Sequence, residues 1–137
     1  MITSDKQYAA AKKQLDMLTA SLSAPKKEGV PDLVDKAGRA QTQELINEIQ
    51  ASMKEYDDLK NTNPSDIEIH SLDDLMVTPI RYRIASHMSL DAFGRKVGVS
   101  ARQIARYEQE EYQNTNTPTL QKILKMLNIH LDGRVTE

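Results

Sequence analysis

Residues 89–109 read SLDAFGRKVGVSARQIARYEQ, and they carry the clearest helix signals of the C-terminal half. Ser89 is placed to cap a helix over LDAFGRKV, because its hydroxyl can accept a hydrogen bond from a backbone N–H of the first turn. Gly98 allows the left-handed backbone conformation that ends a helix. Ser100 then caps a second helix over ARQIARYEQ. Two short helices joined by a tight turn that contains glycine form a helix-turn-helix unit.

The apolar residues of this stretch predict how its two helices pack. They recur where the inner faces of the helices should meet, at Phe93, Val97, Val99, Ile104 and Tyr107. Gly94 is expected where the two helices cross closely, because a side chain larger than Ala would push them apart.

Flanking residues predict further helices on both sides of the unit. Ser71 and Asp74 have the spacing of a cap for a short helical turn, and Thr78 followed by Pro79 opens a helix over IRYRIASHM. A Thr-Pro pair at 117–118 opens another helix over TLQKILKML. The expected fold class is therefore all-α, with a five-helix C-terminal domain.

Basic side chains are concentrated between Pro79 and Arg106. This segment contains six Lys and Arg residues against one acidic residue, Asp91, whereas the whole chain has a net charge of −2. A net-acidic chain with one basic face is the footprint of a small DNA-binding module. The six basic residues are Arg81, Arg83, Arg95, Lys96, Arg102 and Arg106.

The outward side of the helix over 101–109 carries the residues expected to read DNA bases. In a helix-turn-helix unit the second helix lies in the major groove with its N-terminal residues against base edges. Arg102 and Arg106 can each donate two hydrogen bonds to guanine, and Ala101 can contact a thymine methyl group. Gln103 lies beside them and can pair with an adenine or a phosphate.

A second set of residues is expected to bind phosphates without reading sequence. Backbone N–H groups at the helix starts near Ser89 and Ser100 suit phosphate oxygens. Arg95 and Lys96 supply attraction that does not depend on base sequence.

The stretch MSLDAFGRKVGVSARQIARYE, followed by TPTLQKILKMLNI, resembles the Xre, or lambda-repressor-like, helix-turn-helix family over roughly residues 78–131. The resemblance implies an all-α domain, a homodimer and a pseudo-palindromic operator of double-stranded DNA. The family often has a basic or glycine-rich loop after the second helix of the unit, whereas this chain has EQEEYQNTNT. Neutral phosphate contacts are expected there instead, from Asn114, Asn116 and Thr117.

The layout of the whole chain resembles the HigA-type antitoxins, which join an N-terminal helical half to a C-terminal Xre-like half. The opening ITSDKQYAAAKKQLDML is similar to the first helix of that group. This resemblance implies a cognate ribonuclease toxin as a partner and repression of the operon that encodes both.

The N-terminal part predicts an antiparallel, coiled-coil-like helical hairpin. Ser4 caps a helix over 4–22, residues 23–31 break it with two prolines and a glycine, and a longer helix runs over 32–60. Apolar residues at steps of three and four form a seam along both helices. A two-helix hairpin buries little by itself. The seam is therefore expected to serve dimerisation or partner binding, through Leu15, Leu18, Leu22, Leu45, Ile49 and Tyr56.

Three parts are expected along the chain: the hairpin at 1–60, a linker at 61–71 and the helix-turn-helix domain at 72–137. The linker opens with NTNP, a sequence typical of turns. Within it, the alternation of polar and apolar residues over Asp66–His70 predicts a short strand.

Composition excludes several other classes of protein. The 137 residues include no Cys, so disulfides, thiolate zinc sites and cysteine nucleophiles are excluded. The three His residues lie in different elements, and no metal site, catalytic residue or cofactor is expected. An enzyme is therefore the weakest class. No apolar run approaches the roughly 20 residues of a membrane span, and a cytoplasmic protein is expected.

Two alternatives to an antitoxin remain open. In the first, the hairpin captures a protein partner and the Xre-like fold is a scaffold, which Leu90 and the acidic stretch 108–111 favour. In the second, the chain represses phage or metabolic genes and the hairpin serves only dimerisation.

Overall fold

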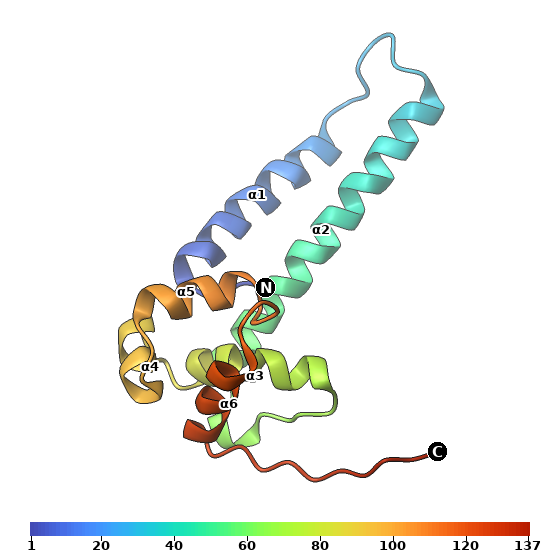
Figure 1. Ribbon diagram of the computed structural model, residues 1–137. Coiled ribbons are helices and arrows are strands. Elements are labelled where there is room, and N and C mark those ends of the chain that lie inside the picture. The colour runs from blue at the N-terminus through green and yellow to red at the C-terminus, as the bar shows by residue number, and fades with distance from the viewer. The chain divides into compact units, whose positions relative to one another are not determined.

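A computed structural model describes all residues from 1 to 137 and contains six α-helices, one short 3-10 helix and no strand (Figure 1). The all-α fold class predicted from the sequence is confirmed. The chain divides into two compact units, Met1–Leu59 and Lys60–Glu137. The three-part division expected from the sequence stays a prediction. None of the helices combines the length and the apolar character needed to cross a bilayer.

The first unit is the predicted pair of helices, α1 (Asp5–Ser23) and α2 (Asp32–Lys60). The predicted cap is formed: the Ser4 hydroxyl accepts a hydrogen bond from the Gln7 N–H at 3.1 Å. The side chain of Gln7 in turn accepts from the backbone N–H of Thr3 at 2.9 Å. The cap therefore gives the Gln7 N–H in the first turn of α1 a partner, which fixes where the helix begins.

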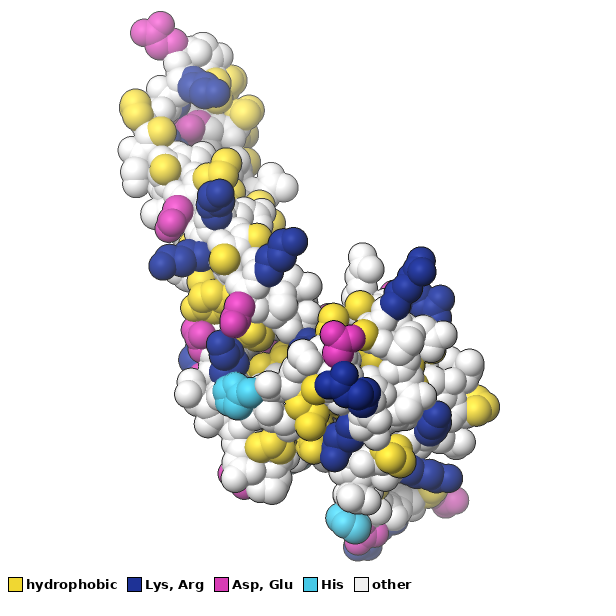
Figure 2. All heavy atoms as spheres, turned by 90° about the vertical axis from the view of Figure 1, so that its left-hand side faces the viewer, with side chains coloured by type: hydrophobic (Ala, Val, Ile, Leu, Met, Phe, Trp, Pro, Cys, Tyr) yellow, Lys and Arg dark blue, Asp and Glu magenta, His cyan; other side chains and the backbone are white.

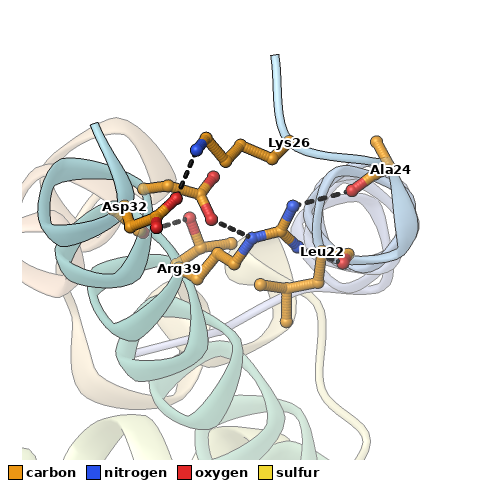
Figure 3. A network of polar contacts seen from close by, with 8 residues as sticks. Leu22, Ala24, Lys26, Asp32 and Arg39 are labelled. Carbon is orange, nitrogen blue, oxygen red and sulfur yellow. Dashed lines mark hydrogen bonds and ion pairs between the residues drawn. The ribbon is translucent and has the colours of Figure 1, made fainter. Parts of the chain in front are cut away.

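Arg39 ties the two helices together near the loop that joins them (Figure 3). Its guanidinium donates to the carbonyl oxygens of Leu22 at 2.6 Å and Ala24 at 2.8 Å, and to the Asp35 carboxylate at 3.0 Å. One side chain on α2 thus satisfies carbonyl groups that the end of α1 leaves without helical partners.

Two tyrosines tie the other ends of α1 and α2. The rings of Tyr8 and Tyr56 lie 5.6 Å apart. The Tyr8 hydroxyl donates to Asp57 at 2.8 Å, and the Tyr56 hydroxyl donates to Asp5 at 2.7 Å. The hairpin is therefore held by polar contacts near both of its ends.

The apolar seam between these contacts is only partly buried. Helix α1 has no buried residue, and α2 buries only Ile46 and Tyr56. Leu45, expected within the seam, is 42% exposed, because Ile46 occupies the inward position of that helical turn. The other expected seam residues are half-buried: Leu15, Leu18, Leu22 and Ile49.

The second unit contains α3 (Leu72–Ala85), α4 (Leu90–Val97), α5 (Ala101–Gln109) and α6 (Thr117–Met126). These four α-helices replace the expected five, because the turn expected after Ser71 and the helix expected from Thr78 are one helix, α3. Thr78 is not its cap: the hydroxyl of Thr78 donates to the Asp74 carbonyl at 2.7 Å. Pro79 is inside α3, where its fully buried ring offsets the helical hydrogen bond that proline cannot make.

The predicted strand over residues 66–70 was wrong. Asn63 caps a 3-10 helix, η1 (Pro64–Asp66), and the residues that follow have no neighbouring strand. A strand needs a ladder of hydrogen bonds to a second extended segment. The alternation itself is present, because Ile67 and Ile69 are half-buried whereas Glu68 and His70 are exposed.

The core of the second unit is formed by side chains from all four of its α-helices and from the loop after α5. Phe93, Val97 and Ile104, predicted on the inner faces, are fully buried, and Tyr107 is 6% exposed. Val99 is half-buried. Other fully buried side chains are Ile80, Tyr112 and Ile123.

Asp74 predicts a pH dependence of stability. The pKa of Asp74 lies below its usual range, because the His70 N–H donates to its carboxylate and Arg81 lies beside it. A carboxylate with a lowered folded pKa stabilises the fold above its unfolded pKa and loses that contribution as the pH falls through the folded pKa. We expect the free energy of unfolding to fall below about pH 4, and Asp74→Asn to weaken that fall. Urea unfolding of the natural chain and of Asp74→Asn at several pH values across this range tests the prediction. An equal loss of the free energy of unfolding in both proteins would contradict it.

Candidate nucleic-acid interface

Helices α4 and α5 form the predicted helix-turn-helix with the predicted caps. The Ser89 hydroxyl accepts from the Ala92 N–H at 3.1 Å, and the Ser100 hydroxyl accepts from the Gln103 N–H at 3.2 Å. Gly98 ends α4 with a φ of 74°, in the left-handed region that favours glycine. The direction of α5 relative to α4 is therefore set by a turn that the sequence specifies residue by residue.

Gly94 brings the backbone of this turn into contact with α4. The Gly94 carbonyl accepts from the N–H groups of Gly98 at 2.8 Å and Val99 at 3.0 Å. A Cβ atom at Gly94 would lie 2.4 Å from the carbonyl oxygen of Val99 and 3.3 Å from the Ala101 nitrogen. The backbone at Gly94 therefore lies closest to the turn rather than to a second helix. Even an Ala side chain does not fit there, whereas the sequence predicted that only side chains larger than Ala would be excluded.

Helix α5 has one buried and one exposed side. Ile104, Tyr107 and Glu108 are buried. The side chains expected to read bases lie outside this buried set: Arg102, Gln103 and Arg106 are exposed, and Ala101 is half-buried.

Arg106 is positioned by its neighbour. Its guanidinium carbon lies 5.3 Å from the centre of the Tyr107 ring, an arrangement in which the ring face attracts the cation. Because Tyr107 is held in the core, this contact limits the directions in which Arg106 points. The guanidinium nitrogens remain able to donate to an acceptor in front of α5.

The residues expected to bind phosphates are all exposed; they are Ser89, Arg95, Lys96, Ser100, Asn114, Asn116 and Thr117. Asn116, and not Thr117, caps α6, because its side-chain oxygen accepts from the Thr119 N–H at 2.9 Å. Lys96 lies 5.7 Å from the ring of Tyr82. Three capped helix starts and two cations are therefore open to solvent.

Figure 2 faces the side on which α4 and α5 lie in Figure 1. Lys and Arg side chains, in dark blue, are spread over the unit that contains these helices, with few acidic side chains between them. The exposed basic side chains of α4 and α5 are Arg95, Lys96, Arg102 and Arg106.

The assignment of Arg83 to the basic face was wrong. Arg83 is 7% exposed and donates two hydrogen bonds to the carboxylate of Glu108, at 2.6 and 2.7 Å. A third bond goes to the Met88 carbonyl at 3.0 Å. Arg81 pairs with Asp74 at 3.2 Å. Two of the six basic residues therefore hold the fold together, and the cation set of the interface is smaller than predicted.

The Arg83–Glu108 pair fixes the end of α5 to α3. Burial raises the pKa of Glu108, and the hydrogen bonds and charge of Arg83 oppose that rise. Burial also raises the pKa of Tyr112, whose hydroxyl has no hydrogen-bond partner. The signal for the pair was present in the sequence: Arg83 follows Ile80 by three residues and Glu108 follows Ile104 by four, which places each on its helix's buried side.

Lys122 is a further residue that sequence reasoning missed. Its Nζ donates to the Gly98 carbonyl oxygen at 3.2 Å, at the C-terminal end of α4. A cation there interacts favourably with the helix dipole and with a carbonyl that has no helical partner. Lys122 thereby links α6 to the turn that sets the direction of α5.

Comparison with known proteins agrees with this geometry. A family model described as Helix-turn-helix matches residues 80–133, which cover the C-terminal part of α3 together with α4, α5 and α6. Searches of curated proteins and of solved structures found no match. The family match supports a DNA-binding transcription regulator. Residues 80–133, which are less than half of the chain, therefore match the helix-turn-helix model of the Xre, or lambda-repressor-like, family.

Proposed function

We propose that this chain is a sequence-specific repressor that binds double-stranded DNA as a homodimer. The observation that carries the proposal is the two-sided character of α5. Its buried side anchors the helix through Ile104 and Tyr107, and its solvent side presents Arg102, Gln103 and Arg106. A rigidly held helix with guanidinium groups on its free side suits base recognition in a major groove.

In the proposed mechanism α5 reads the bases and α4 binds the phosphates. Helix α5 enters the major groove, where Arg102 and Arg106 can each donate two hydrogen bonds to a guanine. The exposed start of α4 and the cations Arg95 and Lys96 hold the phosphates. In a homodimer the two copies of α5 read half-sites about 34 Å apart, which requires a pseudo-palindromic operator.

DNA binding is tested with the purified full chain and the DNA upstream of its own gene. Fluorescence anisotropy is measured with this DNA and with a shuffled duplex, each at two salt concentrations. We expect tight binding that prefers the upstream DNA and weakens with salt, because phosphate contacts release counterions. Weak binding without preference would overturn the repressor proposal.

Arg102→Ala tests the base-reading role. We expect a loss of about 1–3 kcal/mol at the operator, with relaxed discrimination at one base position. The matched control is Arg95→Ala, which removes a phosphate contact and should weaken operator and shuffled duplex alike. Anisotropy titrations of both variants against operators changed at single positions give the answer. Equal weakening of all duplexes by Arg102→Ala would contradict base reading.

We propose further that the chain is the antitoxin of a toxin–antitoxin pair and represses their shared operon. The support is the separate hairpin unit, which leaves apolar side chains in solvent, among them Met17 at 71% and Leu45 at 42% exposure. Such side chains give a ribonuclease toxin a surface to bind that is separate from the basic residues of α5.

The antitoxin role is tested with the product of the open reading frame next to the gene. We expect that product alone to arrest growth, and co-expression of the full chain to restore it. A Leu45→Glu variant should lose the rescue while its operator binding is unchanged. A neighbouring product without toxicity, or rescue that is independent of the hairpin, would leave a repressor of other genes as the function.

A further inference from the structure

A groove of about 570 Å³ in the second unit is not used by the proposed DNA interface. Residues of the 63–69 segment, of α3 and of the 127–130 segment line it. Its lining is largely apolar, through Pro64, Ile67, Ile69, Tyr82, Leu127 and Ile129. Exposed apolar surface gathered in one place often marks an interaction site.

One wall of the groove has unpaired backbone groups. The N–H groups of Glu68 and Ile69 donate no hydrogen bond within the chain. Ile67 is extended, with φ −69° and ψ 121°, and half-buried side chains alternate with exposed ones from Ile67 to His70. This is the pattern of a strand that lacks a neighbour.

Residues 131–137 have the complementary character. They form no regular structure and all are exposed, with Leu131 at 59% and Val135 at 94% exposure. They directly follow His130, which lines the groove, and in Figure 1 this segment runs away from the helices of its unit. An extended segment with exposed apolar side chains at every fourth position is suited to fill such a groove.

Charge makes one pairing register between residues 66–70 and residues 132–136 more favourable than the others. In antiparallel pairing with Arg134 opposite Glu68, Asp132 lies opposite His70 and Val135 lies opposite Ile67. Arg134 then meets the oppositely charged Glu68 on the outer face, and Val135 meets Ile67 on the inner face.

Other registers are less favourable. A shift of the antiparallel pair by two residues in one direction places Asp132 opposite Glu68, and a shift in the other direction places Thr136 opposite Glu68, which removes the ion pair. Parallel pairing with Arg134 opposite Glu68 places Asp132 opposite Asp66. Each of these alternatives either loses the ion pair between Arg134 and Glu68 or juxtaposes like charges, which destabilises a strand pair.

We propose that residues 132–136 of a second copy of this chain pair antiparallel with residues 66–70 and fill the groove. The inference rests on the proposed homodimer and assigns its interface. Within one chain the segment would have to reverse direction immediately after His130, which is itself part of the groove lining. Exchange between two copies needs no such reversal, and it gives a symmetric interface in which each copy supplies one strand and one groove.

Cysteine cross-linking of the full chain tests the register, because the natural chain contains no Cys and only introduced thiols react. Ile67→Cys and Val135→Cys are prepared as separate variants, mixed and oxidised, and analysed on a non-reducing gel. Directly opposed residues of an antiparallel pair approach closely enough for a disulfide. We expect at least fivefold more covalent dimer in the mixture than with either variant alone.

Two further pairs complete the design. Glu68→Cys mixed with Arg134→Cys should also cross-link, and both positions are exposed, so folding is not at risk. Ile67→Cys mixed with Thr136→Cys is the matched control, since these residues lie on opposite faces in the proposed register. Circular dichroism of each variant confirms that the chain remains helical.

Each remaining outcome overturns the proposal in a distinguishable way. A disulfide within one chain of the double variant Ile67→Cys/Val135→Cys, without cross-linking in the mixture, would show that the segment closes on its own groove. No cross-link from either pair, in a chain that is dimeric by light scattering, would place the dimer interface elsewhere. A monomer by light scattering would also remove the homodimer, and the anisotropy experiment decides separately whether DNA is bound.

Discussion

Replacement of Glu108 by Ala should lower the free energy of unfolding of the helix-turn-helix unit by about 3–5 kcal/mol. Glu108 is 5% exposed and accepts both of its charged hydrogen bonds from Arg83. Removing the carboxylate leaves the Arg83 guanidinium buried without its counter-charge, and that desolvation cost dominates the loss. Urea unfolding followed by circular dichroism measures the change.

Two control variants separate the buried charge from general effects of substitution. Glu110→Ala removes an exposed acidic side chain two residues away and should change stability by no more than about 0.5 kcal/mol. The double variant Arg83→Met/Glu108→Leu removes both charges and should recover most of the stability lost by Glu108→Ala. If the double variant were no more stable than the single one, an unpaired charge would not be the cause.

The local signals in the sequence were sufficient to predict most helices and the exposed side of α5. The boundaries of α4 and α5 followed from Ser89, Gly98 and Ser100, because caps and left-handed stops depend on one residue and its immediate neighbours. The exposed side of α5 followed from the helical period once its apolar residues were assigned to the core.

Interactions between distant residues were not predictable in the same way. Arg83 and Glu108 are 25 residues apart, and each alone is typical of a solvated surface. Only their shared placement on inward helical positions indicated a buried pair. The helix start predicted at Pro79 was wrong for a related reason. A Thr-Pro pair usually opens a helix, but α3 begins earlier, at the Ser71 cap.

The segment 66–70 shows where a local pattern was correct but its structural consequence was not. The alternation of polar and apolar residues predicted which side chains turn inward, and Ile67 and Ile69 are half-buried as expected. A strand also requires a partner, which the sequence of one segment cannot supply. The proposed pairing with residues 132–136 of a second copy would provide it.

Replacement of Gly94 by Ala should destabilise the helix-turn-helix unit by about 3 kcal/mol, the upper end of the usual range for overpacking. The added Cβ would lie 2.4 Å from the Val99 carbonyl oxygen, which is backbone and cannot rotate away as a side chain would. The turn must therefore move, and α5 moves with it. We expect operator binding to fall even at temperatures where the unit stays folded.

Gly38→Ala is the matched control, because Gly38 is also within a helix and a Cβ there meets nothing within 4 Å. It should stabilise the chain by about 0.4–1 kcal/mol, since Ala loses less conformational entropy than Gly when a helix forms. The same Gly→Ala substitution should therefore lower the free energy of unfolding at position 94 and raise it at position 38. The difference between the two changes measures the cost of the clash at Gly94. If Gly94→Ala also raised stability, α4 and the turn would not be in the contact that fixes the direction of α5.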